Sequence, residues 1–262
     1  MGIPDLITDA GSAATKTAAC LPAPPRGLRR PALFLDMDGV LAPLAPTPEA
    51  VVPDGRRTAV LKALSERFPG RVAILSGRTI AEIDRISEAS VAPASGVHGL
   101  ERRRADGSLT RAEAAPSVRT AVAAFEDFAR GRPGLIVEDK AVSAGLHYRG
   151  APAEAEAAEA LARRLADETG LALQVGKLVV ELKTPGTDKG TALTAFMAEP
   201  PFAGAVPVMV GDDLTDEHAF EAATALGGFG VLVGPPRATA ARYGLRDVDE
   251  VLTWLETVEA RP

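Results

Sequence analysis

The sequence predicts an α/β protein whose core is a parallel sheet flanked by helices, with a smaller α+β domain inserted into that core. Short apolar runs alternate with amphipathic helical segments over residues 31–104 and again over 184–262, as in a parallel sheet with helical crossovers. Between 105 and 183 the pattern changes to pairs of closely spaced strands. Strands joined by so few residues must pair antiparallel. Residues 1–30 are rich in Pro, Ala and Gly, and we expect a flexible tail there.

The first half of the core begins with an apolar run at 32–35, typical of a strand buried on both faces. The spacing of apolar residues then predicts a helix that ends at Gly70, a second buried strand at 71–75, and a helix capped by Thr79. The apolar positions of these helices are Val60, Leu61, Leu64 and Phe68, then Ile80, Ile83 and Ile86.

The insert is predicted to contain two helices and two pairs of short strands. The helices span 118–128 and 152–170, and the strands span 135–138, 143–149, 171–175 and 178–182. The last two strands are joined through Gly176 and Lys177. The core pattern resumes with a strand at 206–210, a helix through Phe220, a strand at 231–233 and a final helix with Asp249 as its N-cap.

Charge and cysteine content exclude several classes of protein. A net charge of −6 argues against binding nucleic acid or an anionic membrane through bulk electrostatics. No apolar run approaches the ~20 residues that span a bilayer, and the first residues do not resemble a secretory signal. Cys20 is the only cysteine, so an intrachain disulfide is impossible, and we expect a reducing, cytoplasmic location.

The most informative segment follows the first strand, where Asp36 and Asp38 precede Gly39. In open α/β sheets ligands bind at the carboxyl ends of the strands. Two acids so close repel each other unless a cation, usually a divalent metal, lies between them. The alternative is an ordinary Asx-type turn after a strand.

Two further segments could hold an anion. Ser76 ends the second strand and faces a helix start, where backbone N–H groups favour a phosphate, although such positions are usually turns. Lys189 lies in the first turn of a helix and opposes the helix dipole, which a bound phosphate would explain. A lysine at such a position, taken alone, is much more often an ordinary surface lysine.

Four acids fall between residues 211 and 217, directly after a buried strand. This density of like charge costs stability unless a cation shares the site. Asp216 and Glu217 suit a helix N-terminus and could be caps. Asp212 is the acid least explained by capping.

Together these segments resemble the motifs of haloacid dehalogenase (HAD) superfamily phosphatases, with a Rossmann-like core and an inserted cap. They resemble more narrowly the trehalose-6-phosphate phosphatases. The matching segments are Leu35–Gly39, Leu75–Arg78, Gly96–Glu101, His147–Arg149, Gly176–Glu181, Asp188–Gly190 and Gly211–Glu217. The similarity extends from about residue 31 to the C-terminus.

The resemblance implies a Mg²⁺-dependent reaction that passes through an aspartyl-phosphate. Asp36 would be the nucleophile and Asp38 the general acid and base. Mg²⁺ would be held by the Asp36 carboxylate, the Asp38 carbonyl and the Asp212 carboxylate. Ser76 and Lys189 would hold phosphoryl oxygens. Asp213 and Asp216 would orient metal-bound waters or Lys189.

The insert would act as a cap that closes over the site and recognises the sugar. The expected substrate contacts are Arg78, Glu101, His147, Arg149, Lys177 and Glu181, with a solvated strand residue or a structural ion pair as the alternative for each. His98 would order the hinge near Gly96 and Gly99.

The implied activity is hydrolysis of trehalose 6-phosphate, with a possible functional link to a trehalose-6-phosphate synthase. One alternative is a phosphatase for another sugar phosphate, such as sucrose 6-phosphate. Another is a catalytically silent module that binds a sugar phosphate or assists a synthase. A P-type or phosphotransferase relative would need a membrane span or an acceptor site, and the sequence indicates neither.

Overall fold

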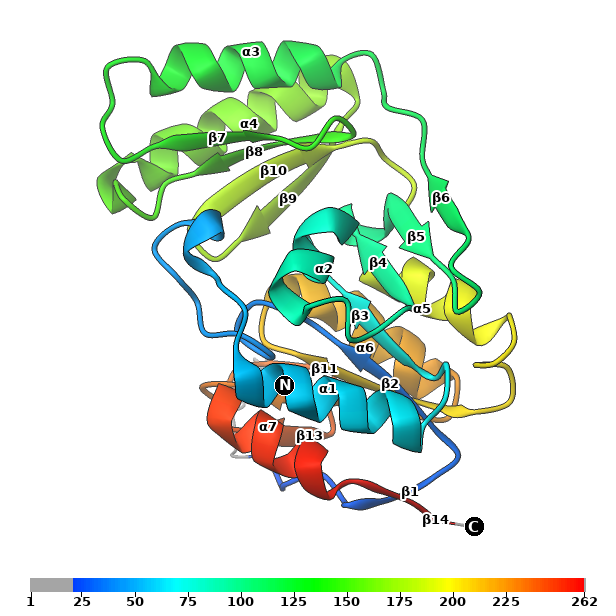
Figure 1. Cartoon of the computed structure of the whole chain (residues 1–262). Coiled ribbons are helices and arrows are strands. Elements are labelled where there is room, and N and C mark those ends of the chain that lie inside the picture. Colours follow the sequence, from blue (N-terminus) through cyan, green and yellow to red (C-terminus); the bar gives the residue numbers. More distant parts are fainter. Residues whose placement is uncertain (1–20, 262) are drawn as a thin grey trace, which may run out of the picture.

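A computed structural model of the chain describes residues 21–261 and shows two helix-covered sheets of unequal size, together with a small two-stranded sheet (Figure 1). The larger sheet has eight strands and the smaller has four. The expected α/β class with a parallel sheet is therefore confirmed.

The large sheet has the strand order β13-β12-β11-β2-β3-β4-β5-β6. Its parallel strands are β13 (Tyr243–Leu245), β12 (Phe229–Val233), β11 (Val206–Gly211), β2 (Pro31–Leu35), β3 (Val72–Leu75) and β4 (Ala94–Gly96). Two antiparallel strands, β5 (Glu101–Arg103) and β6 (Leu109–Arg111), extend one edge. Every residue of β2 is buried, which is why this strand has no polar alternation in its sequence.

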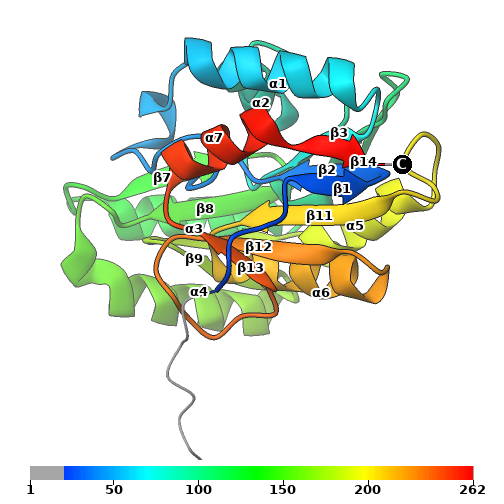
Figure 2. The same cartoon turned by 90° about the horizontal axis from the view of Figure 1, so that it is seen from below.

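Helices cover both faces of the large sheet. One face packs against α1 (Gly55–Arg67), α2 (Ile80–Ser87) and α7 (Val248–Thr257), and the other against α5 (Lys189–Met197) and α6 (Glu217–Ala225) (Figure 2). Because β2, β3 and β11 are parallel neighbours, their carboxyl ends lie side by side at the same end of the sheet. They are followed by Asp36, Ser76 and Asp212. This end of the sheet is where the sequence predicted a site.

The insert forms the smaller sheet, with the order β7-β8-β10-β9 and all neighbours antiparallel. Its elements are α3 (Val118–Ala129), β7 (Ile136–Asp139), β8 (Ser143–His147), α4 (Ala155–Thr169), β9 (Ala172–Gly176) and β10 (Val179–Lys183). The two helices pack on one face of this sheet, and its other face is turned toward the core (Figure 1). From β10 the chain returns through residues 184–188 directly into α5.

The expected boundaries need two corrections. Strand β6 pairs with β5, so the large sheet continues to Arg111, past the expected start of the insert at residue 105. Of the expected tail, residues 1–20 lie outside the described residues, but β1 (Gly27–Arg29) pairs with β14 (Glu259–Arg261). Leu28 is buried, and the Pro25 carbonyl accepts a hydrogen bond from the Trp254 indole at 3.2 Å. No local sequence pattern predicts this pairing, because β14 is far from β1 in the sequence.

The caps agree with expectation in one helix and differ in another. Thr79 and Glu82 form a capping box at the start of α2, as the Thr79 position predicted. Helix α7 is instead capped by Asp247, whose carboxylate accepts from the Glu250 backbone N–H at 2.9 Å, so the choice of Asp249 was wrong. No helix in the part described, 21–261, is long and apolar enough to cross a membrane.

Candidate active site

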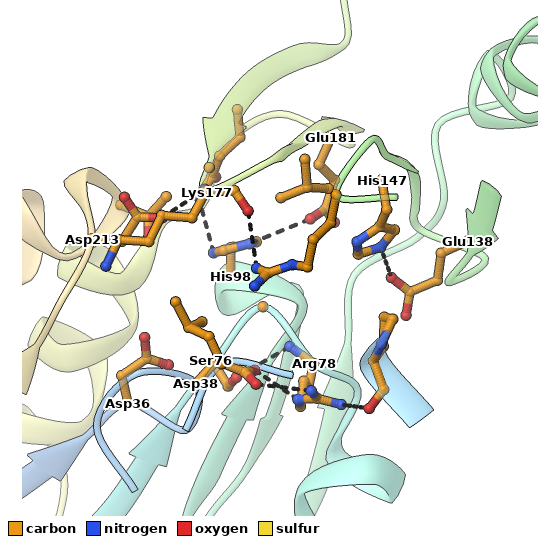
Figure 3. A pocket seen from close by; sticks show the side chains of 18 of the residues that line it. Asp36, Asp38, Ser76, Arg78, His98, Glu138, His147, Lys177, Glu181 and Asp213 are labelled. Carbon is orange, nitrogen blue, oxygen red and sulfur yellow. Dashed lines mark hydrogen bonds and ion pairs between the residues drawn. The ribbon is translucent and has the colours of Figure 1, made fainter. Parts of the chain in front are cut away.

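A pocket lies between the carboxyl edge of the large sheet and the open face of the insert sheet (Figure 3). Its lining includes Asp36, Asp38, Ser76, Arg78, Lys189, Asp212 and Asp213 from the core. From the insert it includes Glu138, Lys140, His147, Arg149, Gln174, Lys177 and Glu181. Segments far apart in the sequence thus converge on one cavity.

Lys189 joins the two acidic segments at the bottom of the pocket. Its ammonium lies 2.8 Å from the Asp36 carboxylate and 2.6 Å from the Asp216 carboxylate, and all three side chains are buried. Burial alone would lower the pKa of Lys189, but the attraction of Asp216 and Asp36 outweighs it and raises that pKa above its usual range. Burial also raises the pKa of Asp36, against the opposing effect of Lys189. Lys189 is therefore a fixed positive charge beside the nucleophile candidate.

Asp216 has a structural task in addition to its contact with Lys189. Its second carboxylate oxygen accepts the backbone N–H groups of Asp212 and Asp213 at 2.9 and 3.0 Å. The loop after β11 is thereby folded around a buried carboxylate. Asp216 therefore contacts both Lys189 and the backbone of this loop.

Gly39 allows the two acidic loops to approach each other closely. It has φ +78°, and a Cβ added there would lie 2.1 Å from an Asp212 carboxylate oxygen. Only glycine fits such a position without displacing Asp212. Burial raises the pKa of Asp212 to about 6, although the nearby Lys177 ammonium acts to lower it.

The acidic cluster has the donor set of a site for a divalent cation. Within the described part of the chain, Asp36, Asp212 and Asp216 each offer a carboxylate oxygen, and these atoms lie within 4.8 Å of one another. All three residues are buried, so their mutual repulsion is poorly screened. Hard cations such as Mg²⁺ prefer carboxylate and carbonyl oxygens. The residues therefore fit a divalent metal, and Lys177 already brings an ammonium to Asp212.

Asp38 does not point freely into the pocket, because Arg78 holds both of its carboxylate oxygens. The Arg78 Nε and Nη2 groups donate to them at 2.7 and 2.8 Å. The same guanidinium donates to the Pro48 carbonyl at 3.0 Å and lies 3.3 Å from the Glu82 carboxylate. Arg78, expected to contact substrate, is thus engaged with the acid–base candidate (Figure 3).

Ser76 lies directly after β3, in the position expected for an anion seat. It is buried, and its hydroxyl accepts the Arg78 backbone N–H at 3.2 Å. Lys177 occupies the turn between β9 and β10 and not the strand itself, and its ammonium contacts Asp212 of the core. Arg149 lies beside this turn and donates to the Lys177 carbonyl at 3.3 Å.

The insert lines the pocket with a buried network of charged groups. Glu181 accepts from the Ser143 hydroxyl at 2.5 Å and lies 3.5 Å from the Lys140 ammonium. Burial would raise the pKa of Glu181, but Lys140, His98 and Ser143 together lower it below its usual range. His147 lies 2.9 Å from Glu138, whose other neighbour is Lys140.

One expected substrate residue lies elsewhere. Glu101 does not line the pocket: its carboxylate accepts the Ile80 backbone N–H at 2.8 Å and the Arg111 guanidinium at 2.9 Å. It therefore holds the start of α2 and the strand β6. The structure therefore places Glu101 outside the pocket lining, and a contact between Glu101 and substrate stays a prediction.

On the insert side of the pocket wall, sequence reasoning missed three polar residues, namely Glu138, Lys140 and Gln174. They flank or lie within short strands whose facing direction depends on the fold of the insert. The sequence signal that comes nearest to predicting them is the pair Glu138 and Lys140, at the end of the strand predicted at 135–138. Such charged pairs are also common on solvated surfaces.

Comparison with known proteins agrees with this geometry. The family model described as trehalose-phosphatase matches residues 34–249. The chain belongs to the trehalose-phosphatase family. It is 38% identical over 237 residues to the trehalose-6-phosphate phosphatase of Escherichia coli K12, covering 87% of this chain and 86% of that protein.

Solved structures agree on the fold of this family member. The C-terminal domain of trehalose-6-phosphate phosphatase from C. albicans superposes with a TM-score of 0.80 at 22% identity, covering 92% of this chain and 99% of that one. A phosphatase of the haloalkanoate (HAD) enzyme superfamily from Bacteroides thetaiotaomicron gives 0.58 at 19% identity, covering 87% and 93%. The expected family is confirmed by the family model and the E. coli relative, and these structures share its fold.

Proposed function

We propose that this protein hydrolyses trehalose 6-phosphate to trehalose and phosphate with the help of Mg²⁺. The observation that carries the proposal is the contact of Lys189 with Asp36 at 2.8 Å, beside Asp212 and under the polar wall of the insert. A buried carboxylate next to a fixed ammonium and further acids suits phosphoryl transfer, which needs positioning and charge neutralisation. Family membership and the E. coli relative support the choice of substrate.

In the first step Asp36 attacks phosphorus. A bond forms between an Asp36 carboxylate oxygen and phosphorus while the bond from phosphorus to the sugar oxygen breaks. Asp38 gives its proton to that sugar oxygen, and trehalose leaves. Because Arg78 holds both oxygens of Asp38, one of these contacts must open for the transfer.

In the second step water hydrolyses the aspartyl-phosphate. Asp38, now a carboxylate, takes a proton from the attacking water, and the bond between phosphorus and Asp36 breaks to release phosphate. Lys189 and the Ser76 hydroxyl hold the phosphoryl oxygens through both steps. Asp36, the Asp38 carbonyl and Asp212 would hold Mg²⁺, which would neutralise phosphoryl charge.

The insert acts as a cap over the bound sugar. Glu181, His147, Arg149 and Lys177 line its side of the pocket, where charge-assisted hydrogen bonds to sugar hydroxyls are favourable. We place the cap at about 112–183 and the catalytic core on either side of it. We also place the reaction in the cytoplasm, with a functional link to the synthase that makes its substrate.

The direct test is phosphate release from a panel of trehalose 6-phosphate, sucrose 6-phosphate and glucose 6-phosphate. We expect turnover of trehalose 6-phosphate with Mg²⁺, none with EDTA, and much slower turnover of the other two. The Asp36→Asn variant should be inactive and should keep the unfolding midpoint of the wild type. Faster hydrolysis of sucrose 6-phosphate would replace the substrate assignment, and near-normal activity of Asp36→Asn would remove the nucleophile.

A further inference from the structure

We propose that His98 is a positioning residue that holds the sugar-facing wall of the insert in register with the phosphate seat at 76–78. This proposal rests on the proposed function and extends it. His98 lies in the short helical turn Val97–Gly99 between β4 and β5, and its ring points into the pocket beneath the insert (Figure 3). It contacts the core through its backbone and the insert through its ring.

The backbone at this turn is strained and is fixed to the phosphate seat. Val97 and His98 have φ values of 44° and 52°, although neither is glycine. Residues held in such conformations cost about 1–3 kcal/mol each, and they are found mainly at functional sites. The Val97 N–H donates to the Arg78 carbonyl at 2.9 Å, and the His98 N–H donates to the Ser76 carbonyl at 3.0 Å. These two hydrogen bonds hold His98 in its strained conformation and fix it relative to Ser76 and Arg78.

The imidazole spans the gap from the core to two strands of the insert. A Cβ on Gly77 would lie 2.5 Å from its Nε2, so the ring packs directly on the phosphate-seat loop. On the other side, Gln174 of β9 lies 3.1 Å from Nδ1, and the Glu181 carboxylate of β10 lies 3.4 Å from Nε2. The ring is buried, and burial lowers the pKa of His98, which suits a neutral ring with the proton on Nε2.

The same turn also contacts the connection through which the insert rejoins the core. The His98 carbonyl accepts from the Thr187 hydroxyl at 3.3 Å. A Cβ on Gly99 would lie 3.0 Å from the Asp188 carbonyl oxygen, so this connection packs closely against the turn. Core loop, insert sheet and return connection therefore meet at one residue, and loss of the ring should loosen the insert without displacing Ser76.

The test is a double-mutant cycle between His98→Asn and Gln174→Ala. Asparagine tolerates the left-handed backbone but is too short to reach both insert strands. Each single variant should raise KM for trehalose 6-phosphate about tenfold with less effect on kcat, and the double variant should be no worse than His98→Asn alone. Inhibition by inorganic phosphate, which needs only the core, should change less than about twofold. The control is His218→Asn, at an exposed histidine outside the pocket whose ring contacts the Asp188 carboxylate at 3.1 Å but neither Gln174 nor Glu181.

Additive effects of the two substitutions on KM would overturn the proposal, because they would show that the residues do not act together. Equal losses of phosphate and substrate affinity would also overturn it, since they would indicate a distorted phosphate seat. Small-angle scattering gives a readout that does not depend on turnover. Both single variants should have a larger radius of gyration than the wild type and His218→Asn, and identical values would overturn the proposal. A wild type without phosphatase activity would overturn the proposed function instead.

Discussion

The ammonium of Lys177 lies against the carboxylate of Asp212, so a turn of the insert touches the acidic cluster of the core directly. The Lys177 backbone N–H also donates to the Asp213 carboxylate at 3.2 Å. Lys177 is partly exposed at the pocket mouth, whereas Asp212 is buried. The insert therefore supplies a positive charge at the position assigned to the metal.

Replacement of Lys177 by methionine should strengthen Mg²⁺ binding in the absence of substrate. The ammonium and the metal compete for Asp212, and a partly exposed ion pair contributes about 0.2–1 kcal/mol, which corresponds to a Kd lower by a factor of about 1.4 to 5. Isothermal titration calorimetry measures this directly, with the exposed Lys62→Met as a control. An unchanged or weaker affinity would show that Lys177 and the metal do not share Asp212.

Gly39→Ala should lower the affinity for Mg²⁺ in addition to destabilising the fold. The added Cβ would meet the Asp212 carboxylate at 2.1 Å, in addition to the strain of φ +78°. Gly227→Ala is a close control, because Gly227 has φ +82° and nothing lies within 4 Å of its would-be Cβ. Both variants should lose about 1–3 kcal/mol of unfolding free energy, measured by urea denaturation. Only Gly39→Ala should lose Mg²⁺ affinity, and equal Mg²⁺ binding by both would contradict this assignment.

Arg78→Met should impair hydrolysis by releasing Asp38 from its two-point contact. If Asp38 is the acid and base, we expect a loss of about 10²-fold in kcat for trehalose 6-phosphate. An aryl phosphate with a good leaving group needs less proton donation and should lose less. Arg103→Met is the matched control, because Arg103 grips both oxygens of Asp84 at 2.6 and 2.7 Å outside the pocket. Equal losses on both substrates would indicate that Arg78 binds phosphate instead.

The stability of the protein should fall in acid partly through Glu181. Its neighbours lower its pKa in the folded state, so its stabilising effect is present above the ordinary value of 4.5 and is lost as the pH falls below it. At pH 7, Glu181→Gln should cost about 3 kcal/mol because Lys140 loses a buried partner. We would measure the difference in unfolding free energy between the wild type and Glu181→Gln by urea denaturation between pH 7 and pH 4. This difference should shrink below pH 4.5. The exposed Glu126→Gln should behave like the wild type, and a constant difference for Glu181→Gln would exclude the linkage.

The strands and helices of the core were predictable because burial imposes clear patterns on them. The runs at 32–35 and 71–75 are apolar throughout, since helices cover both faces of the sheet. The edge strands β5 and β6 were missed, because β6 is exposed along its length and pairs only at one sheet edge. The pairing of β1 with β14 depends on contacts between the two ends of the described chain, which no local pattern reports.

The positions of Asp36, Ser76, Lys189 and Asp212 followed from strand and helix ends, because parallel strands bring their carboxyl ends to one edge. Contacts between side chains could not be predicted in the same way. Arg78 donates to the Asp38 carboxylate, and Glu101 accepts from the Ile80 backbone N–H. Only the folded loops bring these partners together. The network of Lys140 with Glu138 and Glu181 depends likewise on how the insert sheet faces the core.

The return connection at 184–188 enters α5 immediately before Lys189, whose ammonium neutralises Asp36. The connection of the insert to the core and the counter-charge of Asp36 therefore belong to one short stretch of chain. Lengthening this stretch should loosen the insert and also disturb the position of Lys189 beside Asp36. Shortening it should restrain the insert. We expect its length to tolerate little change, although surface loops elsewhere accept insertions readily.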